Sequence, residues 1–160
     1  MSNSYDEPRA HRLRKAYQAA FGGDELPVPV ESIAEDLLGL AVEMRDDLSV
    51  SGMLLPSERR IVVRSDEPEP RRRFTIAHEL GHWVCQCLEG TAKPVYCRAD
   101  EIGVNPDAKA LEREANIFAA NLLMPEPAVR DSDGKNRFGV SAEALSWRLF
   151  NLGLTSERPA

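Results

Sequence analysis

The spacing of hydrophobic positions along the chain predicts five helices and three short strands. In the helical segments apolar residues recur every three to four positions, and glycine, proline or a polar loop follows the last of them. The strand segments are short runs rich in aliphatic and β-branched residues. The predicted helices are 8–21, 28–40, 71–88, 108–124 and 141–151, and the predicted strands are 40–45, 51–56 and 59–65.

The three strand segments follow one another directly, and the second and third are joined by a turn-like sequence, PSER. We therefore predict a small, mostly antiparallel meander packed with helices, which places the chain in the α+β class. The segment 91–107 lacks a helical pattern. It is predicted to be irregular, with a brief strand at 95–97.

Length and composition favour one ordinary globular domain. A chain of 160 residues, 42% hydrophobic and 29% charged, is long enough to bury a single core. No apolar run approaches the ~20 residues that a membrane helix requires, and the N-terminal segment lacks the apolar core of a secretory signal. We expect a cytoplasmic protein that does not bind membranes, with Cys85, Cys87 and Cys97 as reduced thiols.

The charge balance argues against direct binding of nucleic acid. With a net charge of -6, the chain lacks the basic excess that phosphate binding normally shows. Basic residues do cluster locally near the N-terminus. We expect Arg9, Arg12, Arg14 and Lys15 to lie on a solvated helix.

The pentapeptide HELGH, residues 78–82, is the most specific chemical motif of the chain. Residues four apart share a face of a helix, so His78 and His82 can present two imidazoles to one metal ion, with Glu79 beside them. The main apolar arc of the predicted helix lies on the opposite side. We therefore interpret the histidines as metal ligands rather than core residues. The apolar arc comprises Ile76, Ala77, Leu80, Trp83, Val84, Cys87 and Leu88.

A third ligand is expected from the helix predicted at 108–124, because a catalytic zinc site typically takes three protein ligands. Glu112 shares a face with Ala115 and other small or apolar residues, where a carboxylate is costly unless it is paired or metal-bound. Glu114 lies on the opposite side, and we expect it to be exposed. Asn116, one turn after Glu112, is placed to hydrogen-bond a histidine ligand.

A second metal site built from the cysteines is disfavoured. Structural zinc sites need four ligands, and their paired cysteines are usually separated by about two to four residues. Cys85 and Cys87 are separated by one residue, and His11 is the one histidine outside the HELGH motif. Buried thiols that bind no metal are the simpler interpretation.

The sequence RFTIAHELGHW, followed by EREANIFAANLLMP, resembles the ImmA/IrrE metallopeptidases, a group similar to the gluzincins. The resemblance covers about 28–154, which leaves an N-terminal helix and lead-in at 1–27 and a tail at 155–160. It implies a zincin-like active-site helix and Zn²⁺ as the metal, with Mn²⁺ as an alternative. The implied ligands are His78, His82 and Glu112, and the implied general base is Glu79.

Peptide-bond hydrolysis is the activity that this resemblance implies. Zinc would acidify a water molecule and polarise the scissile carbonyl, while Glu79 would pass the proton of the water to the leaving amine. The implied substrate is a regulatory protein, a helix-turn-helix repressor of a mobile element or a stress response. Strand 51–56 could hold the substrate by β-addition, although an ordinary sheet strand explains it equally well. Arg148 is a weak candidate for stabilising the oxyanion, and a surface ion pair is the favoured interpretation.

Two other functions stay open. One is a non-proteolytic, antitoxin-like partner of a repressor or toxin, with a structural zinc. The presence of Glu79 argues against it, because a purely structural site has no use for a base. The other is a hydrolase of small peptides, which a short and closed cleft would favour.

Overall fold

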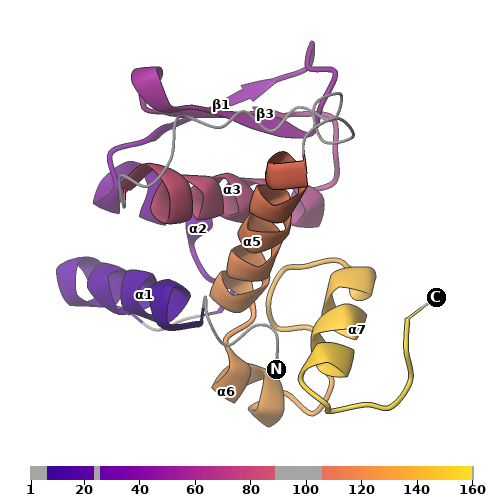
Figure 1. Cartoon of the computed structure of the whole chain (residues 1–160). Helices are drawn as coiled ribbons and strands as arrows, with labels where there is room; N and C mark the ends of the chain where they lie inside the picture. The colour runs from indigo at the N-terminus through magenta and orange to yellow at the C-terminus, as the bar shows by residue number, and fades with distance from the viewer. Residues whose placement is uncertain (1–6, 24–25, 89–105, 160) are drawn as a thin grey trace.

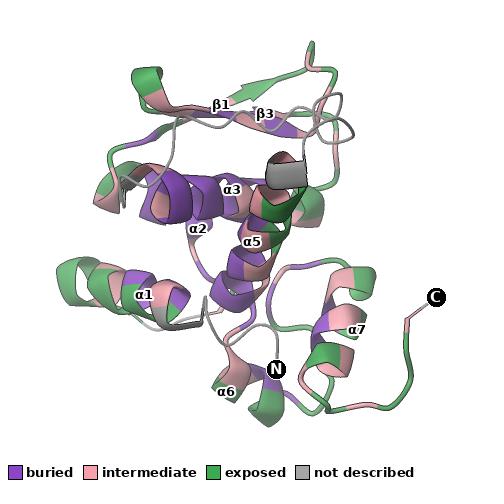
Figure 2. Ribbon diagram, in the orientation of Figure 1, coloured by how far each residue is buried: buried purple, intermediate pink, exposed green. Residues whose placement is uncertain are grey.

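One helix, α3 (Glu69–His82), lies between the sheet and the other helices in the computed structural model (Figure 1). The structure describes residues 7–23, 26–88 and 106–159. Helix α3 continues into a π-helical segment, η3 (Trp83–Leu88). The second half of α3, from Thr75 onwards, is mostly buried, as Figure 2 shows. The predicted α+β class is confirmed.

Most of the predicted helices are present with small shifts of their ends. The predicted helix 71–88 corresponds to α3 and η3, and the one predicted at 28–40 is shorter and divided. A helix that the sequence pattern did not indicate, α6, begins after Pro125 and has Pro127 in its first turn, where proline is well tolerated. The remaining helical elements are α1 (Glu7–Phe21), α2 (Val30–Ser32), η1 (Ile33–Leu37), η2 (Pro56–Glu58), α5 (Pro106–Leu123), α6 (Glu126–Asp131) and α7 (Ala142–Asn151).

The sheet is mixed, so the predicted antiparallel meander is wrong. Its strands are β1 (Ala41–Arg45), β2 (Gly52–Leu55) and β3 (Arg60–Arg64), in the order β1-β3-β2. Strands β2 and β3 are antiparallel, whereas β1 and β3 are parallel. The reason lies in β3, whose residues Ile61 and Val63 are fully buried and Val62 is 1% exposed. A strand with such a continuous apolar run favours the centre of a sheet, and the more polar β1 takes an edge.

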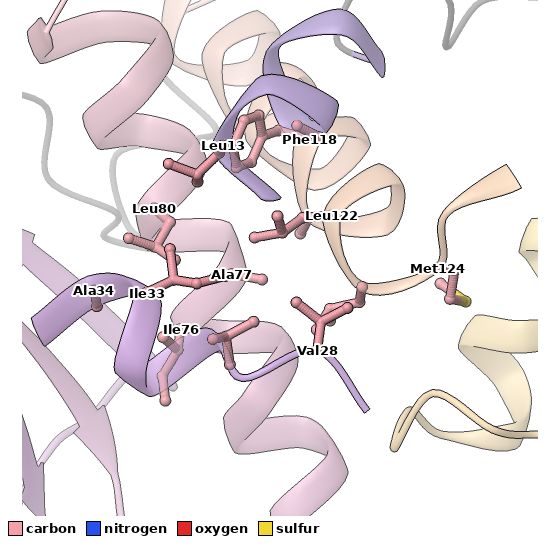
Figure 3. Close-up of a cluster of buried hydrophobic side chains, with 14 of the residues drawn as sticks. Leu13, Val28, Ile33, Ala34, Ile76, Ala77, Leu80, Phe118, Leu122 and Met124 are labelled. Atoms are coloured by element: carbon pink, nitrogen blue, oxygen red, sulfur yellow. The ribbon is translucent and has the colours of Figure 1, made fainter. Parts of the chain in front are cut away.

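A single hydrophobic core joins α1, α3 and α5. Leu13 of α1, Leu80 of α3 and Phe118 of α5 meet in it, together with Ile33 (Figure 3). Of the apolar arc predicted on the motif helix, Ile76, Ala77, Leu80 and Trp83 are buried, whereas Val84 and Cys87 are partly exposed; the side chain of Leu88 lies outside the described residues.

Helices α3 and α5 share the most extensive packing of any described pair of elements. They cross closely at Gly81. A Cβ atom at this position would lie 3.0 Å from both the Cα and the carbonyl oxygen of Ala115, and 3.2 Å from the Cβ of Phe118. The hydrogen of glycine therefore permits an approach that a larger side chain would obstruct.

Arg14 corrects one expectation about the basic N-terminal helix. Its side chain is buried rather than solvated, and its Nη1 donates to the carbonyl oxygens of Asn121 and Leu122, at 2.7 and 3.3 Å. The last carbonyls of a helix have no partner within that helix. Arg14 supplies one at the end of α5 and thereby fixes α1 against it. Arg12 and Lys15 are exposed, as expected.

Two further expectations concern the segment 91–107 and helices that could cross a membrane. The irregular segment predicted at 91–107 and its brief strand at 95–97 lie outside the described residues, except that 106–107 begin α5. No helix among the described residues combines the length and the apolarity that crossing a membrane requires.

We expect Gly81→Ala to lower the free energy of unfolding. In an open helix this change stabilises by roughly 0.5–1 kcal/mol. At the crossing with α5 the added methyl group meets backbone atoms of Ala115, and such overpacking costs roughly 1–3 kcal/mol. Urea denaturation followed by circular dichroism measures the net effect. A variant more stable than the wild type would show that the crossing tolerates a side chain.

Candidate metal centre

The HELGH segment of α3 faces α5, and the two helices bring His78, His82 and Glu112 together. Each residue offers one ligand atom, and these atoms lie within 4.8 Å of one another. The Nε2 of His78 is 3.1 Å from Oε1 of Glu112, and the Nε2 of His82 is 2.7 Å from Oε2. Among the described residues, this is the group of His, Cys, Asp and Glu side chains that could hold an ion.

The other ring nitrogen of each histidine lies beside an amide oxygen. Nδ1 of His78 is 2.8 Å from Oδ1 of Asn116, and Nδ1 of His82 is 2.5 Å from Oε1 of Gln86. An amide oxygen only accepts hydrogen bonds, so these two contacts are hydrogen bonds when Nδ1 of each ring carries the hydrogen. Both Nε2 atoms are thereby directed towards Glu112. The hydrogen bond expected from Asn116 to a motif histidine is confirmed.

The donor set fits a divalent metal ion. Two imidazole nitrogens and a carboxylate are ordinary zinc ligands, and in a tetrahedral zinc site with bonds of about 2.0–2.1 Å the ligand atoms are roughly 3.3 Å apart. The distances from Glu112 to the two Nε2 atoms, 3.1 and 2.7 Å, are close to that spacing. The ligand atoms of the whole group lie within 4.8 Å of one another, so the side chains would have to adjust for all three to reach one ion.

The electrostatics of the group keep Glu112 ionised. Burial raises the pKa of Glu112, but the hydrogen bonds from His78 and His82, and their charges, outweigh it and hold that pKa well below its usual range. Burial lowers the pKa of His78; the hydrogen bond to Glu112 and the charges of Glu79 and Glu112 more than reverse this, so the pKa of His78 is raised. A carboxylate that stays charged among imidazoles is in the state that binds a cation.

Glu79 lies next to this group without belonging to it. Its side chain is 1% exposed, and it lines the same cleft as His78 and Glu112. Gly52, at the start of β2, lies directly opposite. A Cβ atom on Gly52 would stand 3.7 Å from Oε2 of Glu79 and only 2.4 Å from Cγ2 of Thr75. Glycine therefore brings the edge of the sheet down onto the helix at the position of this carboxylate.

A cleft of about 1100 Å³ passes over the site. Its walls come from segments 49–52 and 64–75, from α3 and α5, and from α7, which contributes Trp147 and Arg148. A larger hollow of about 1320 Å³ lies between α1 and α6, but none of the residues of the candidate metal centre line it. The chemistry is therefore confined to the first cleft.

Arg148 was expected to form a surface ion pair, and this is wrong. The residue is 2% exposed, its Nε donates to the carbonyl oxygen of Met124 at 3.0 Å, and its Nη1 donates to Oδ1 of Asn121 at 2.8 Å. These bonds tie α7 to the end of α5. Because Arg148 also lines the cleft, its role at the oxyanion stays a prediction.

Glu114 and Gln86 are closer to the site than the sequence analysis indicated. Glu114 is only partly exposed, and its Oε1 accepts a hydrogen bond of 3.2 Å from Nε2 of Gln86. The same glutamine bonds His82 and was not singled out from the sequence. Its spacing was a usable signal, because Gln86 follows His82 by four residues and so shares its face of the helix.

Neither Cys85 nor Cys87 belongs to the group of possible ligands in the described part of the chain. Cys85 is buried and Cys87 is partly buried, and both are thiols rather than halves of a disulfide. Cys97 lies outside the described residues.

Comparison with known proteins agrees with the geometry. Residues 39–150 match the family described as the IrrE N-terminal-like domain. The radiation response metalloprotease IrrE of Deinococcus radiodurans is 28% identical over 139 residues, which is 86% of this chain and 39% of that protein. The protein of the same name from Deinococcus deserti is 28% identical over 138 residues, covering 86% and 46%. The chain thus spans less than half the length of these relatives.

A transcriptional regulator from Mycobacterium tuberculosis has a similar structure, with a TM-score of 0.63 and 20% identity. The similarity covers 93% of this chain and 48% of that one, and at this identity it shows the fold alone. The family match is more informative, because it extends over most of the chain and includes the HELGH motif and Glu112. The chain therefore belongs to the ImmA/IrrE family of metallopeptidases.

Proposed function

We propose that this chain is a zinc-dependent endopeptidase that cleaves a regulatory protein. One observation carries the proposal: His78, His82 and Glu112 converge within 4.8 Å in an open cleft, and the buried carboxylate of Glu79 lies beside them. This is the arrangement that metal-assisted hydrolysis of a peptide bond requires.

In this proposal the metal is held by Nε2 of His78, Nε2 of His82 and the carboxylate of Glu112. Two imidazoles with one carboxylate suit zinc, and the group supports Mn²⁺ as the alternative. When bound, the ion supplies Lewis acidity at the scissile carbonyl and acidifies the attacking water. Three protein ligands leave room for that water.

Glu79 is the proposed general base. It takes a proton from the attacking water and delivers it to the nitrogen of the departing amine, so that no proton is gained or lost overall. Its side chain is 1% exposed, and that of His82 is fully buried. Bulk water is thereby kept away from the reacting groups, which strengthens electrostatic interactions among them.

The cleft supports an extended peptide segment as substrate. At about 1100 Å³ it exceeds the roughly 300–1000 Å³ typical of small-molecule pockets, and it is lined by several separate segments. Strand β2 borders it at Gly52 and pairs with β3 alone among the described strands. Substrate addition to the edge of β2 opposite β3 is one way to hold the segment, and a purely structural strand remains the alternative.

The two competing functions have less support. A purely structural zinc would leave the buried carboxylate of Glu79 without a purpose, and a small-peptide hydrolase would need a shorter and more closed cleft. The relatives carry the name radiation response metalloprotease, which supports a regulatory protein as substrate. A helix-turn-helix repressor of a stress response or mobile element is our specific proposal, and the cytoplasmic location stays a prediction from the sequence.

Metal binding should depend on Glu112. We expect the wild-type chain to bind one zinc ion and Glu112→Gln to lose it, because an amide oxygen is a poor substitute for a charged ligand. Glu126→Gln is the matched control, since Glu126 pairs with Arg130 on α6, away from the metal centre. Atomic absorption after dialysis gives the stoichiometry. Full zinc content in Glu112→Gln would remove this residue from the ligand set.

Catalysis should depend on Glu79 without loss of metal. A general base contributes roughly 10²–10⁴-fold in rate, so we expect Glu79→Gln to keep its zinc and to cleave at least about a hundredfold more slowly. Zinc content and the cleavage rate are measured on the same preparation. A variant that keeps the metal and relieves repression as the wild type does would favour the non-proteolytic binding partner.

Cleavage should be selective. We expect one discrete cut in a helix-turn-helix repressor encoded beside this gene, because a regulatory protease of this kind must spare other proteins. The purified chain is incubated with zinc and either casein or the repressor, and the products are analysed by mass spectrometry. The Glu79→Gln variant is the control for a contaminating protease. Rapid digestion of casein beside an intact repressor would contradict the proposal.

A further inference from the structure

His82 is buried, so its two protein contacts decide which of its ring nitrogens can carry a hydrogen. The side chain has no exposed surface, its Nε2 lies 2.7 Å from Glu112 and its Nδ1 lies 2.5 Å from Oε1 of Gln86. His78 differs, because its side chain is 12% exposed and its partner Asn116 is exposed. Water can therefore stand in for the partner of His78, but not for that of His82.

The amide of Gln86 can face His82 in only one useful direction. Gln86 is 1% exposed, and its Nε2 lies 3.2 Å from Oε1 of Glu114 and 3.4 Å from the carbonyl oxygen of Leu111. Both of these neighbours are acceptors, so the nitrogen end must point to them and the oxygen end to His82. A reversed amide would place its oxygen against two other oxygens.

The direction of the amide determines which nitrogen of His82 can bind a metal. With its oxygen towards the ring, Gln86 accepts from Nδ1, and the neutral imidazole keeps its lone pair on Nε2. A reversed amide would donate to Nδ1 and transfer the ring hydrogen to Nε2. In that tautomer the nitrogen that faces Glu112 would carry a hydrogen and could not coordinate an ion.

Glu114 is itself held by the first helix. Its Oε2 lies 3.5 Å from Nη1 of Arg9, and the two side chains are 36% and 25% exposed. An ion pair this exposed contributes little by itself. Its effect is to keep the carboxylate turned towards Gln86. Helix α1 lies outside residues 39–150, the part of the chain that matches the family.

We propose that Gln86 is a positioning residue that holds His82 in its metal-binding tautomer, and that Glu114, supported by Arg9, fixes the direction of the Gln86 amide. This deepens the proposed function, because it takes His82 as a metal ligand. The hydrogen-bond chain from Arg9 through Glu114 and Gln86 to His82 is present in the structure independently of the proposed function.

The test compares zinc affinity in five full-length variants, measured by competition with a chromogenic chelator. We expect Gln86→Met, which keeps the volume but loses the amide, to bind zinc about 10–100-fold more weakly, the usual effect of losing a ligand's hydrogen-bond partner. Glu114→Gln should weaken binding less, because the oxygen of the new amide can still accept from Nε2 of Gln86, whereas its nitrogen can also donate and so permit the reversed Gln86 amide. Glu126→Gln, remote from the site, is the matched control and should bind zinc as the wild type does.

The fourth variant exchanges the two groups. Gln86→Glu combined with Glu114→Gln places a carboxylate against Nδ1 of His82 and an amide donor behind it. Nδ1 then still has an acceptor, and the hydrogen bond between the two exchanged positions is kept with its direction reversed, because the amide now donates to the carboxylate. We expect this double variant to recover zinc affinity to within a few fold of the wild type. Gln86→Glu alone should bind more weakly than the double variant, because it brings two carboxylates together. Equal affinity of the single and double variants would overturn the proposed chain.

A second measurement does not depend on zinc. The ¹⁵N chemical shifts of the His82 ring in the metal-free protein report whether Nδ1 carries a hydrogen. We expect Nδ1 to carry it in the wild type, where Gln86 accepts it, and to lose it in Gln86→Met, where Nε2 beside Glu112 keeps the hydrogen. Unchanged shifts with unchanged affinity would refute the positioning role. A wild type that binds no zinc would instead contradict the proposed function and leave the tautomer test valid. Should Gln86→Met fail to fold, the exchanged pair carries the test.

Discussion

The close crossing of α3 and α5 at Gly81 is the constraint on which the site depends. Glycine inside a helix costs roughly 1 kcal/mol relative to alanine, so α3 gives up some intrinsic stability at this point. In exchange, α3 can pack directly against the backbone of Ala115. Glu112 lies one helical turn before Ala115, and His82 directly follows Gly81. The same approach that packs the core therefore places a carboxylate opposite both imidazoles.

The polar groups at this crossing form a connected set that is buried at His82 and Gln86 and reaches the cleft at His78, Glu112 and Asn116. Buried polar atoms without partners cost about 1–3 kcal/mol each, and Glu112 accepts contacts from both histidines, with Asn116 and Gln86 on their far sides. In the absence of a metal, a proton shared with Glu112 can occupy the position between the ligand atoms. Binding of a cation must displace it, so metal binding and proton release are coupled.

Periodicity was sufficient to find the residues that meet at the site, because helices fix angular positions locally. His78, His82, Glu112 and Asn116 are all placed as their spacing predicts. The same helical spacing, applied one turn after His82, places Gln86 on the face of the helix that carries His82. It was overlooked because a glutamine between two cysteines carries no chemical signal of its own, and only the contact with Glu114 on another helix shows which way its amide points.

The order of the sheet and the roles of two arginines could not be predicted, because they answer demands of the tertiary structure. The order of the sheet follows from the need to bury β3 on both sides, which no local pattern within β1 or β2 expresses. Arg14 and Arg148 looked like surface residues because arginine usually is one. Both instead bind carbonyl oxygens at the end of α5, which exist as unsatisfied acceptors only once that helix has formed.

Those two arginines also explain how Glu112 can be held accurately on a helix that is mostly distant from the sheet. Arg14 ties the end of α5 to α1, and Arg148 ties it to α7, the helix that forms a wall of the cleft. Misplacement of a catalytic group by about 1 Å can cost a hundredfold in rate. Helix α5 is therefore fixed at two places, its crossing at Gly81 and its end. The same helix positions the ligand Glu112 and, through Arg148, the helix α7 that forms a wall of the cleft.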